Sequence, residues 1–102
     1  MAFNGTEGGE ITLSAGSAMT AAYRASNPGQ TIAHFFGRDI LEELLAQEGC
    51  MGIRIYYGID SDGLKQLVLV GANASENDMT GLVADVSMPC PSRCSSPNKL
   101  NS

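Results

Sequence analysis

The sequence predicts an α+β fold, in which two helices pack on a small, mainly antiparallel sheet built around a central β-hairpin over residues 52–72. Three patterns carry this prediction. Residues 53–59 place an apolar side chain at every second position, which is the period of a half-buried strand. Residues 66–72 are apolar on both faces, as in a central strand. Residues 40–45 repeat isoleucine and leucine at helical spacing.

The chain of 102 residues has the size of a single domain, and no linker-like segment divides it. We expect residues 1–10, which are rich in glycine and polar side chains, to form a flexible lead-in. The tail over residues 89–102 contains three prolines and two cysteines, and the prolines predict an irregular conformation.

Charge and hydropathy exclude two classes of partner. The net charge is −5, the isoelectric point is near 4.5 and the six basic residues are scattered along the chain. Binding to nucleic acid needs clustered Lys and Arg, so we expect no nucleic-acid partner. No apolar run approaches the roughly 20 residues of a membrane helix, so we expect no membrane partner. The amino terminus lacks the features of a signal peptide, which indicates a soluble cytoplasmic protein.

The first helix is predicted to follow an N-cap at Ser14 and to run to about Ser26, where an Asn-Pro-Gly sequence ends it. Residues 31–36 fit either a short extended piece or the start of the next helix, and their alternation favours the extended piece. The second helix is predicted over residues 38–47, and Gly49 lies where a C-terminal cap belongs. We expect this helix to pack on the apolar row of the first hairpin strand, which consists of Ile53, Ile55, Tyr57 and Ile59.

An Asp-Ser-Asp-Gly turn over residues 60–63 joins the two hairpin strands. Its aspartates resemble part of a calcium loop, but the first and last ligand positions would then fall on Gly58 and Leu69. No calcium site is therefore predicted. A polar, turn-like segment follows, and alternation over residues 82–88 predicts a third strand that pairs with the second in a meander.

Two thiols lie four residues apart in the segment Cys90-Pro91-Ser92-Arg93-Cys94, and the arginine between them would lower the pKa of the thiols. Such a pair can chelate a soft metal, form a disulfide or cycle between redox states. Cys50 and His34 would complete a four-ligand zinc set, although nothing in the sequence brings them together. We favour a simpler interpretation: Cys50 is a small buried residue and the tail thiols are free or locally bridged. No cofactor is then expected, and zinc is the minor alternative.

His34 is the single histidine and lies between apolar residues. A general base needs a nucleophile or an orienting carboxylate nearby, and the pattern supplies neither. We therefore interpret His34 as structural and predict no catalytic residue. The sequence leaves the question of an enzyme undecided and favours a non-enzymatic protein.

The second face of the hairpin is the candidate interaction surface. Two helices suffice to cover one face of a small sheet, so the other face is left to a partner or to the folded-back tail. An exposed apolar patch with polar edges commonly marks a contact between proteins. We expect self-association, or another protein partner, through the residues of this face: Arg54, Tyr56, Val68, Val70 and Val83.

Four segments occur together in this chain: Gly49-Cys50-Met51-Gly52-Ile53-Arg54, Leu67-Val68-Leu69-Val70-Gly71, Asn77-Asp78-Met79 and Cys90-Pro91-Ser92-Arg93-Cys94. The combination resembles a family of short, uncharacterised bacterial proteins with a G-C-x-G-I-R strand opening and a C-P-x-x-C tail. The resemblance spans roughly residues 37–102 and implies no activity.

The leading hypothesis is therefore a small, soluble, non-enzymatic interaction protein that self-associates through its sheet as a homo-oligomer. The alternative is a thiol-based metal-binding or redox protein that uses the C-P-S-R-C tail.

Overall fold

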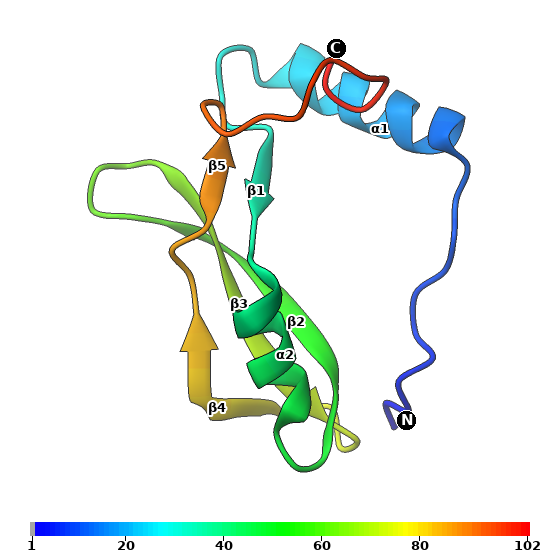
Figure 1. Ribbon diagram of the computed structural model, residues 1–102, viewed down its shortest axis with the longest axis vertical. Coiled ribbons are helices and arrows are strands. Elements are labelled where there is room, and N and C mark those ends of the chain that lie inside the picture. Colours follow the sequence, from blue (N-terminus) through cyan, green and yellow to red (C-terminus); the bar gives the residue numbers. More distant parts are fainter. Residues whose placement is uncertain (1) are drawn as a thin grey trace. The chain divides into compact units, whose positions relative to one another are not determined.

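A computed structural model describes residues 2–102 and has the α+β fold that the sequence predicts (Figure 1). Both of its sheets are antiparallel. One has the strand order β2-β3-β4, and the other consists of β1 and β5. The elements in chain order are α1 (Leu13–Ser26), β1 (Ala33–Phe35), α2 (Arg38–Ala46), β2 (Cys50–Ile59), β3 (Lys65–Asn73), β4 (Asp78–Ala84) and β5 (Met88–Cys90).

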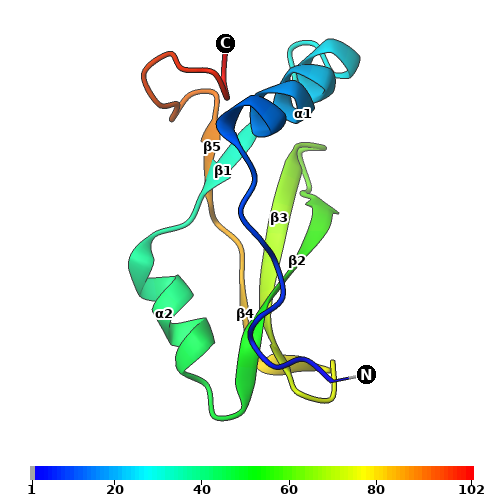
Figure 2. The same ribbon diagram turned by 90° about the vertical axis from the view of Figure 1, so that its right-hand side faces the viewer.

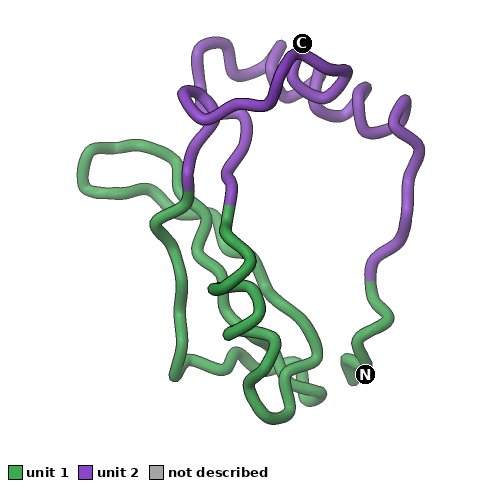
Figure 3. The backbone as a smooth tube through the Cα atoms, viewed as in Figure 1, with its two compact units in different colours: residues 1–7, 36–87 green, residues 8–35, 88–102 purple. Residues whose placement is uncertain are grey.

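The chain divides into two compact units (Figure 3). Unit 1 contains α2 and the three-stranded sheet, together with the segment that ends at Glu7. Unit 2 contains α1, the β1–β5 pair and the tail after β5. No helix among residues 2–102 combines the length and the apolar character that a membrane span requires.

The predicted hairpin is the centre of unit 1. Strands β2 and β3 pair without interruption from Gly52 opposite Ala72 to Ile59 opposite Lys65. Two main-chain hydrogen bonds close the turn: the Gly63 amide donates to the Asp60 carbonyl, and the Asp60 amide donates to the Leu64 carbonyl. Gly63 has a φ of +80°, a conformation that glycine adopts without steric cost.

The core of unit 1 lies between α2 and one end of the sheet (Figure 2). Leu44 is fully buried, and it packs with Leu69 of the central strand β3 and Ala84 of the edge strand β4. This contact follows from the sequence, because α2 presents apolar residues on one side only. Partly buried side chains surround the three, namely Phe36, Ile40, Leu41, Ile53, Leu67 and Leu82.

The prediction that α2 covers the whole apolar row of β2 is wrong beyond Ile53. Ile55 is 54% exposed, Tyr57 is 94% exposed and Ile59 is 75% exposed. The reason is length. A nine-residue helix is about 14 Å long, whereas a ten-residue strand is about 33 Å long. Even a helix laid along the strand would leave more than half of it without cover.

The predicted third strand over residues 82–88 is divided between two sheets. Strand β4 ends at Ala84 and β5 begins at Met88. Val86 lies between them with a φ of 57°, which is incompatible with an extended strand. Strand β5 also takes in Pro89 and Cys90, which we predicted to be irregular. Proline is tolerated there because a strand of a two-stranded sheet always has an open edge.

The helix ends differ slightly from prediction. The N-cap of α1 is Thr12 instead of Ser14, and its hydroxyl accepts a hydrogen bond from the Ala15 amide at 3.0 Å. Helix α2 ends at Ala46 with Gln47 as its C-cap, so Gly49 lies beyond the cap. The ambiguous segment before α2 contains β1, which confirms the extended interpretation.

The core geometry predicts the effect of truncating α2. Leu44→Ala removes a fully buried side chain and should lower the free energy of unfolding by about 2–5 kcal/mol. Leu45→Ala on the same helix truncates a side chain that is 51% exposed, and it should change the stability by less than about 1 kcal/mol. Urea unfolding followed by circular dichroism measures both values. Equal losses for the two variants would contradict the position of this core.

Candidate functional site

Strand β2 forms an edge of the three-stranded sheet (Figure 1). The Asp60 amide donates to the Leu64 carbonyl, which makes Asp60 a hydrogen-bonded position of the hairpin ladder. Such positions alternate along an antiparallel pair. The N–H and C=O groups of Ile55, Tyr57 and Ile59 therefore point away from β3, toward the outer edge. Within residues 2–102, no strand pairs with this edge.

The same three residues expose their side chains, so this edge is both open and apolar. Proteins usually protect edge strands with bulges, prolines or charged side chains. The irregularity in β2 lies at its beginning, between Cys50 and Gly52, and the rest of the strand is continuous. Strand β4, at the opposite edge of the sheet, is interrupted by a register shift across from Val70 and Gly71.

The face that we predicted as the interaction surface is only partly accessible. Val70 is 3% exposed, so it belongs to the interior. Tyr56 is 46% exposed and Val83 is 53% exposed, while Arg54 and Val68 are half-buried. The structure thus brings these five residues onto one face, through the pairs Arg54–Val70, Tyr56–Val68 and Val70–Val83.

A polar cluster occupies this face. The Arg54 guanidinium donates to the Asp78 carboxylate at 2.5 Å and to the Glu76 carbonyl at 3.2 Å. The Tyr56 hydroxyl donates to the other carboxylate oxygen of Asp78, also at 2.5 Å. The Phe3 ring lies 5.5 Å from the guanidinium carbon, within the range of a cation–π contact. The cluster therefore ties β2 to β4 and to the amino-terminal segment.

Sequence reasoning missed Asp78 and Phe3. It assigned Asp78 to a polar turn, whereas the structure pairs Asp78 with Ala72 at the start of β4. The sequence did contain one signal for Asp78. In a meander, an acidic residue in the strand after β3 can lie close to Arg54 in the strand before it. No sequence pattern pointed to Phe3, whose amide donates to the Ala74 carbonyl at 3.0 Å.

The hydrogen bonds of the cluster shift the pKa values of its members. The Tyr56 hydroxyl, and then the Arg54 guanidinium, hold the pKa of Asp78 below its ordinary value. Asp78 in turn raises the pKa of Tyr56, because a phenol that donates to a carboxylate resists ionisation. It also raises the pKa of Arg54. The cluster thus holds a carboxylate, a neutral phenol and a guanidinium at neutral pH.

A shallow depression of about 380 Å³ lies beside this cluster. Its wall includes Arg54, Phe3 and Glu7, and the two Glu7 carboxylate oxygens already accept hydrogen bonds from the Asn4 and Gly5 amides. The remaining lining residues are Gly5, Leu45, Met51, Gly52, Ile53 and Ala72. The Glu7 and Arg54 side chains of this wall are thus engaged in hydrogen bonds within the chain.

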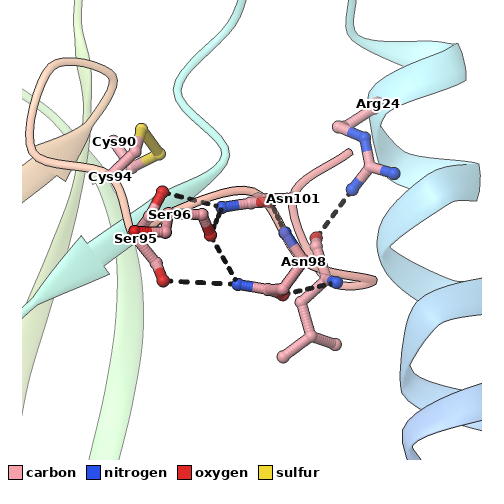
Figure 4. Close-up of a disulfide and its surroundings, with 8 residues drawn as sticks. Arg24, Cys90, Cys94, Ser95, Ser96, Asn98 and Asn101 are labelled. Carbon is pink, nitrogen blue, oxygen red and sulfur yellow. Dashed lines mark hydrogen bonds between the residues drawn. A yellow bond between two sulfur atoms is a disulfide. The ribbon is translucent and has the colours of Figure 1, made fainter.

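The thiol pair of the tail is joined in a disulfide between Cys90 and Cys94 (Figure 4). Their Cα atoms are 4.8 Å apart, and the Arg93 amide closes the turn on the Pro89 carbonyl at 2.9 Å. Cys90 is 5% exposed at the end of β5, whereas Cys94 is exposed. Of the alternatives that the spacing left open, the structure has the local disulfide.

The other candidate metal ligands do not join this pair. Cys50 is a half-buried free thiol in unit 1, and its sulfur donates to the Gly52 carbonyl at 3.2 Å. His34 pairs with Pro89 and Ala33 pairs with Cys90, so His34 and Cys90 lie on opposite faces of the β1–β5 pair. Burial lowers the pKa of His34 and favours its neutral form. Among residues 2–102, no three His, Cys, Asp or Glu side chains converge to hold a metal ion.

No protein-family model matches the chain, and comparisons with curated proteins and with solved structures found no match. The resemblance to a family of uncharacterised bacterial proteins therefore stays a prediction.

The polar cluster predicts a pH dependence of stability. The pKa of Asp78 is lowered in the folded chain, so its contribution is present above the unfolded pKa of about 3.9 and is lost as the pH falls through the lower folded value. Asp78→Asn removes this contribution. Urea unfolding at a series of pH values between 6 and 2 should show that wild type loses more stability than Asp78→Asn.

The matched control is Asp62→Asn, which changes an exposed aspartate in the hairpin turn. This variant should keep the pH dependence of wild type. Parallel curves for wild type and Asp78→Asn would contradict the assignment of the cluster.

Proposed function

We propose that this chain is a small, non-enzymatic interaction protein that forms a homodimer through its sheet. One observation carries the proposal: the outer edge of β2 has no partner strand among residues 2–102, and the residues that present it also expose apolar side chains. A second copy satisfies both features at once, because strand addition pairs the backbone groups and shields the side chains.

Pairing of two β2 edges around a two-fold axis is the simplest arrangement, since the same surface then serves both copies. A register with Tyr57 on the axis places Ile55 of one copy opposite Ile59 of the other. It also places Arg54 of one copy beside Asp60 of the other. Aromatic, β-branched and opposite-charge pairs of this kind each contribute roughly 0.2–1 kcal/mol to strand pairing. The outward-pointing N–H and C=O groups then form the hydrogen bonds between the two β2 strands.

The polar cluster supports this arrangement from the opposite face. Arg54 and Tyr56 belong to β2, and their bonds to Asp78 hold that strand against β4. Strand addition is favoured by an edge that is already extended, because less chain entropy is lost on binding. In this arrangement Arg54 and Tyr56, two of the residues first predicted as the interface, stiffen the edge.

The test is a single substitution on the proposed axis. Tyr57→Lys brings two ammonium groups opposite each other and removes an aromatic pair, so the dimer should dissociate. Light scattering coupled to size exclusion, at about 50 μM, should give twice the 10.7 kDa chain mass for wild type and the mass of one chain for the variant.

Leu64→Lys is the matched control. Leu64 is 57% exposed in the same hairpin but follows the turn, outside the outer edge of β2. This variant should remain dimeric. A single-chain mass for wild type, or equal dissociation of the two variants, would exclude pairing through this edge.

A further inference from the structure

The two cysteines of the Cys90–Cys94 disulfide differ in exposure, because Cys90 is buried and Cys94 is exposed. This difference indicates a function separate from self-association. We propose that the disulfide is a thiol–disulfide exchange site, in which Cys94 is the sulfur attacked by an incoming thiol and Cys90 is the leaving and resolving sulfur. The class of substrate is a thiol or dithiol that reaches the surface of unit 2.

Exposure sets the direction of attack. An incoming thiolate must approach one sulfur of the disulfide from outside, so access decides which sulfur reacts. Cys90 is 5% exposed, pairs with Ala33, and accepts a hydrogen bond on its carbonyl from the Ile32 amide at 2.8 Å. Cys94 lies in the exposed turn that follows. An incoming thiolate therefore has access to Cys94 from solvent, whereas burial restricts its approach to Cys90.

The local charge favours a thiolate. Unit 2 contains three basic residues and one acidic residue, and its net charge is therefore +2, although the whole chain carries −5. Arg93 directly precedes Cys94 in the turn. A neighbouring cation stabilises a thiolate, both when the attacking thiol arrives and when Cys90 leaves. The basic residues of unit 2 are Arg24, Arg93 and Lys99, and the acidic residue is Glu10.

Both flanks of the disulfide are anchored, so the two sulfurs stay close after the bond opens. The β1–β5 pairing holds the Cys90 side. On the Cys94 side, the Asn98 and Asn101 side chains bond to Ser95 and Ser96 (Figure 4). Arg24 of α1 then donates to the Leu100 carbonyl at 2.7 Å and to the Ser102 carbonyl at 3.1 Å. The tail therefore does not depend on the disulfide alone for its position.

The exchange is balanced in atoms and electrons. A substrate thiolate attacks the Cys94 sulfur, the bond between the two cysteine sulfurs breaks, and Cys90 leaves as a thiolate that takes a proton from water. The substrate is then held in a mixed disulfide on Cys94. A second thiol of the substrate attacks the substrate sulfur and releases Cys94 as a thiol. The substrate dithiol has lost two electrons and two protons, and the cysteine pair has gained them.

The mixed disulfide has a second fate when the substrate has a single thiol. The Cys90 thiolate attacks the Cys94 sulfur, expels the substrate thiolate and restores the original disulfide. Cys50 takes no part in either route. Its sulfur donates to the Gly52 carbonyl at 3.2 Å. Cys50→Ser thus provides a background in which Cys90 and Cys94 are the only cysteines of the sequence.

The experiment uses reduced glutathione as the probe on the oxidised full chain carrying Cys50→Ser. After an acid quench, peptide mass spectrometry locates the bound glutathione. We expect the mixed disulfide on Cys94, at least tenfold more often than on Cys90. Glutathione mainly on Cys90, an equal distribution, or a disulfide that resists excess glutathione would each overturn the proposal. Because the chain keeps both tail cysteines, the result does not depend on how variants of this pair fold.

Arg93 provides a separate test of the electrostatic part. Arg93→Glu should slow the reaction with glutathione by about threefold or more, because a carboxylate in the turn repels the incoming thiolate. Lys99→Glu makes the same charge change five residues beyond Cys94 and should have a smaller effect. Equal rates for these two variants, measured from the release of the Cys90 thiol, would contradict the role of Arg93. Neither test involves the β2 edge, so its outcome is independent of dimerisation.

Discussion

Unit 1 depends on the contact between one short helix and one end of a long hairpin. Leu44 of α2 is fully buried there, and Leu69 and Ala84 complete a small core. Burial of a leucine side chain contributes about 1.5–3 kcal/mol, which is a large fraction of the stability of a small domain. Because α2 has nine residues, the same contact leaves the outer half of β2 outside the core. The open, apolar edge of β2 follows from this limit of cover.

The open edge of β2 is unusual because the same residues have unpaired backbone groups and exposed apolar side chains. The backbone N–H and C=O groups of Ile55, Tyr57 and Ile59 point away from β3. Their side chains lie on the face of the sheet that α2 packs against, in the part that α2 does not cover. In most edge strands one of the two components is suppressed, by a bulge or by a charge. Here the charge of β2 lies on the opposite face, where Arg54 bonds to Asp78. That interaction stabilises the strand without protecting its edge.

How far the sequence predicts the fold depends on the range of the contacts. The hairpin and α2 were predicted because the turn residues and the periods of two and 3.6 are local signals. The length of the hairpin that α2 covers was not predicted. The period of a pattern identifies which face is apolar, but it does not say how much of that face a helix covers. The split of the third strand at Val86 had no local signal, since neither glycine nor proline lies at the break. Thr12 and Ser14 are similarly good caps, so the choice between them was beyond a propensity argument.

The candidate sites show the same division. The spacing of Cys90 and Cys94 raised the disulfide as one alternative, but their unequal exposure depends on β1, which lies more than 50 residues earlier in the chain. Likewise, Arg54 and Tyr56 were assigned to the interaction surface from their alternation, whereas Asp78, which binds both, required the register of β4. Residue type and period thus identified individual side chains, and the pairing of distant strands decided what each side chain contacts.

The structure of the sheet also limits how many copies can add to one another by edge pairing. A sheet that grows by strand addition continues for as long as each new copy presents another regular edge, and fibres form in that way. In the proposed dimer both β2 edges are used, and the edges that remain in the combined sheet belong to β4. The register of β4 jumps from Val83 to Met79 between adjacent partners on β3, and Gly81 lies within the interruption. Such an irregular strand offers no continuous ladder to a third copy.

The acidic charge of the chain acts in the same direction, because repulsion between copies increases with each addition. The asymmetry between one regular and one interrupted edge therefore favours closure at two chains.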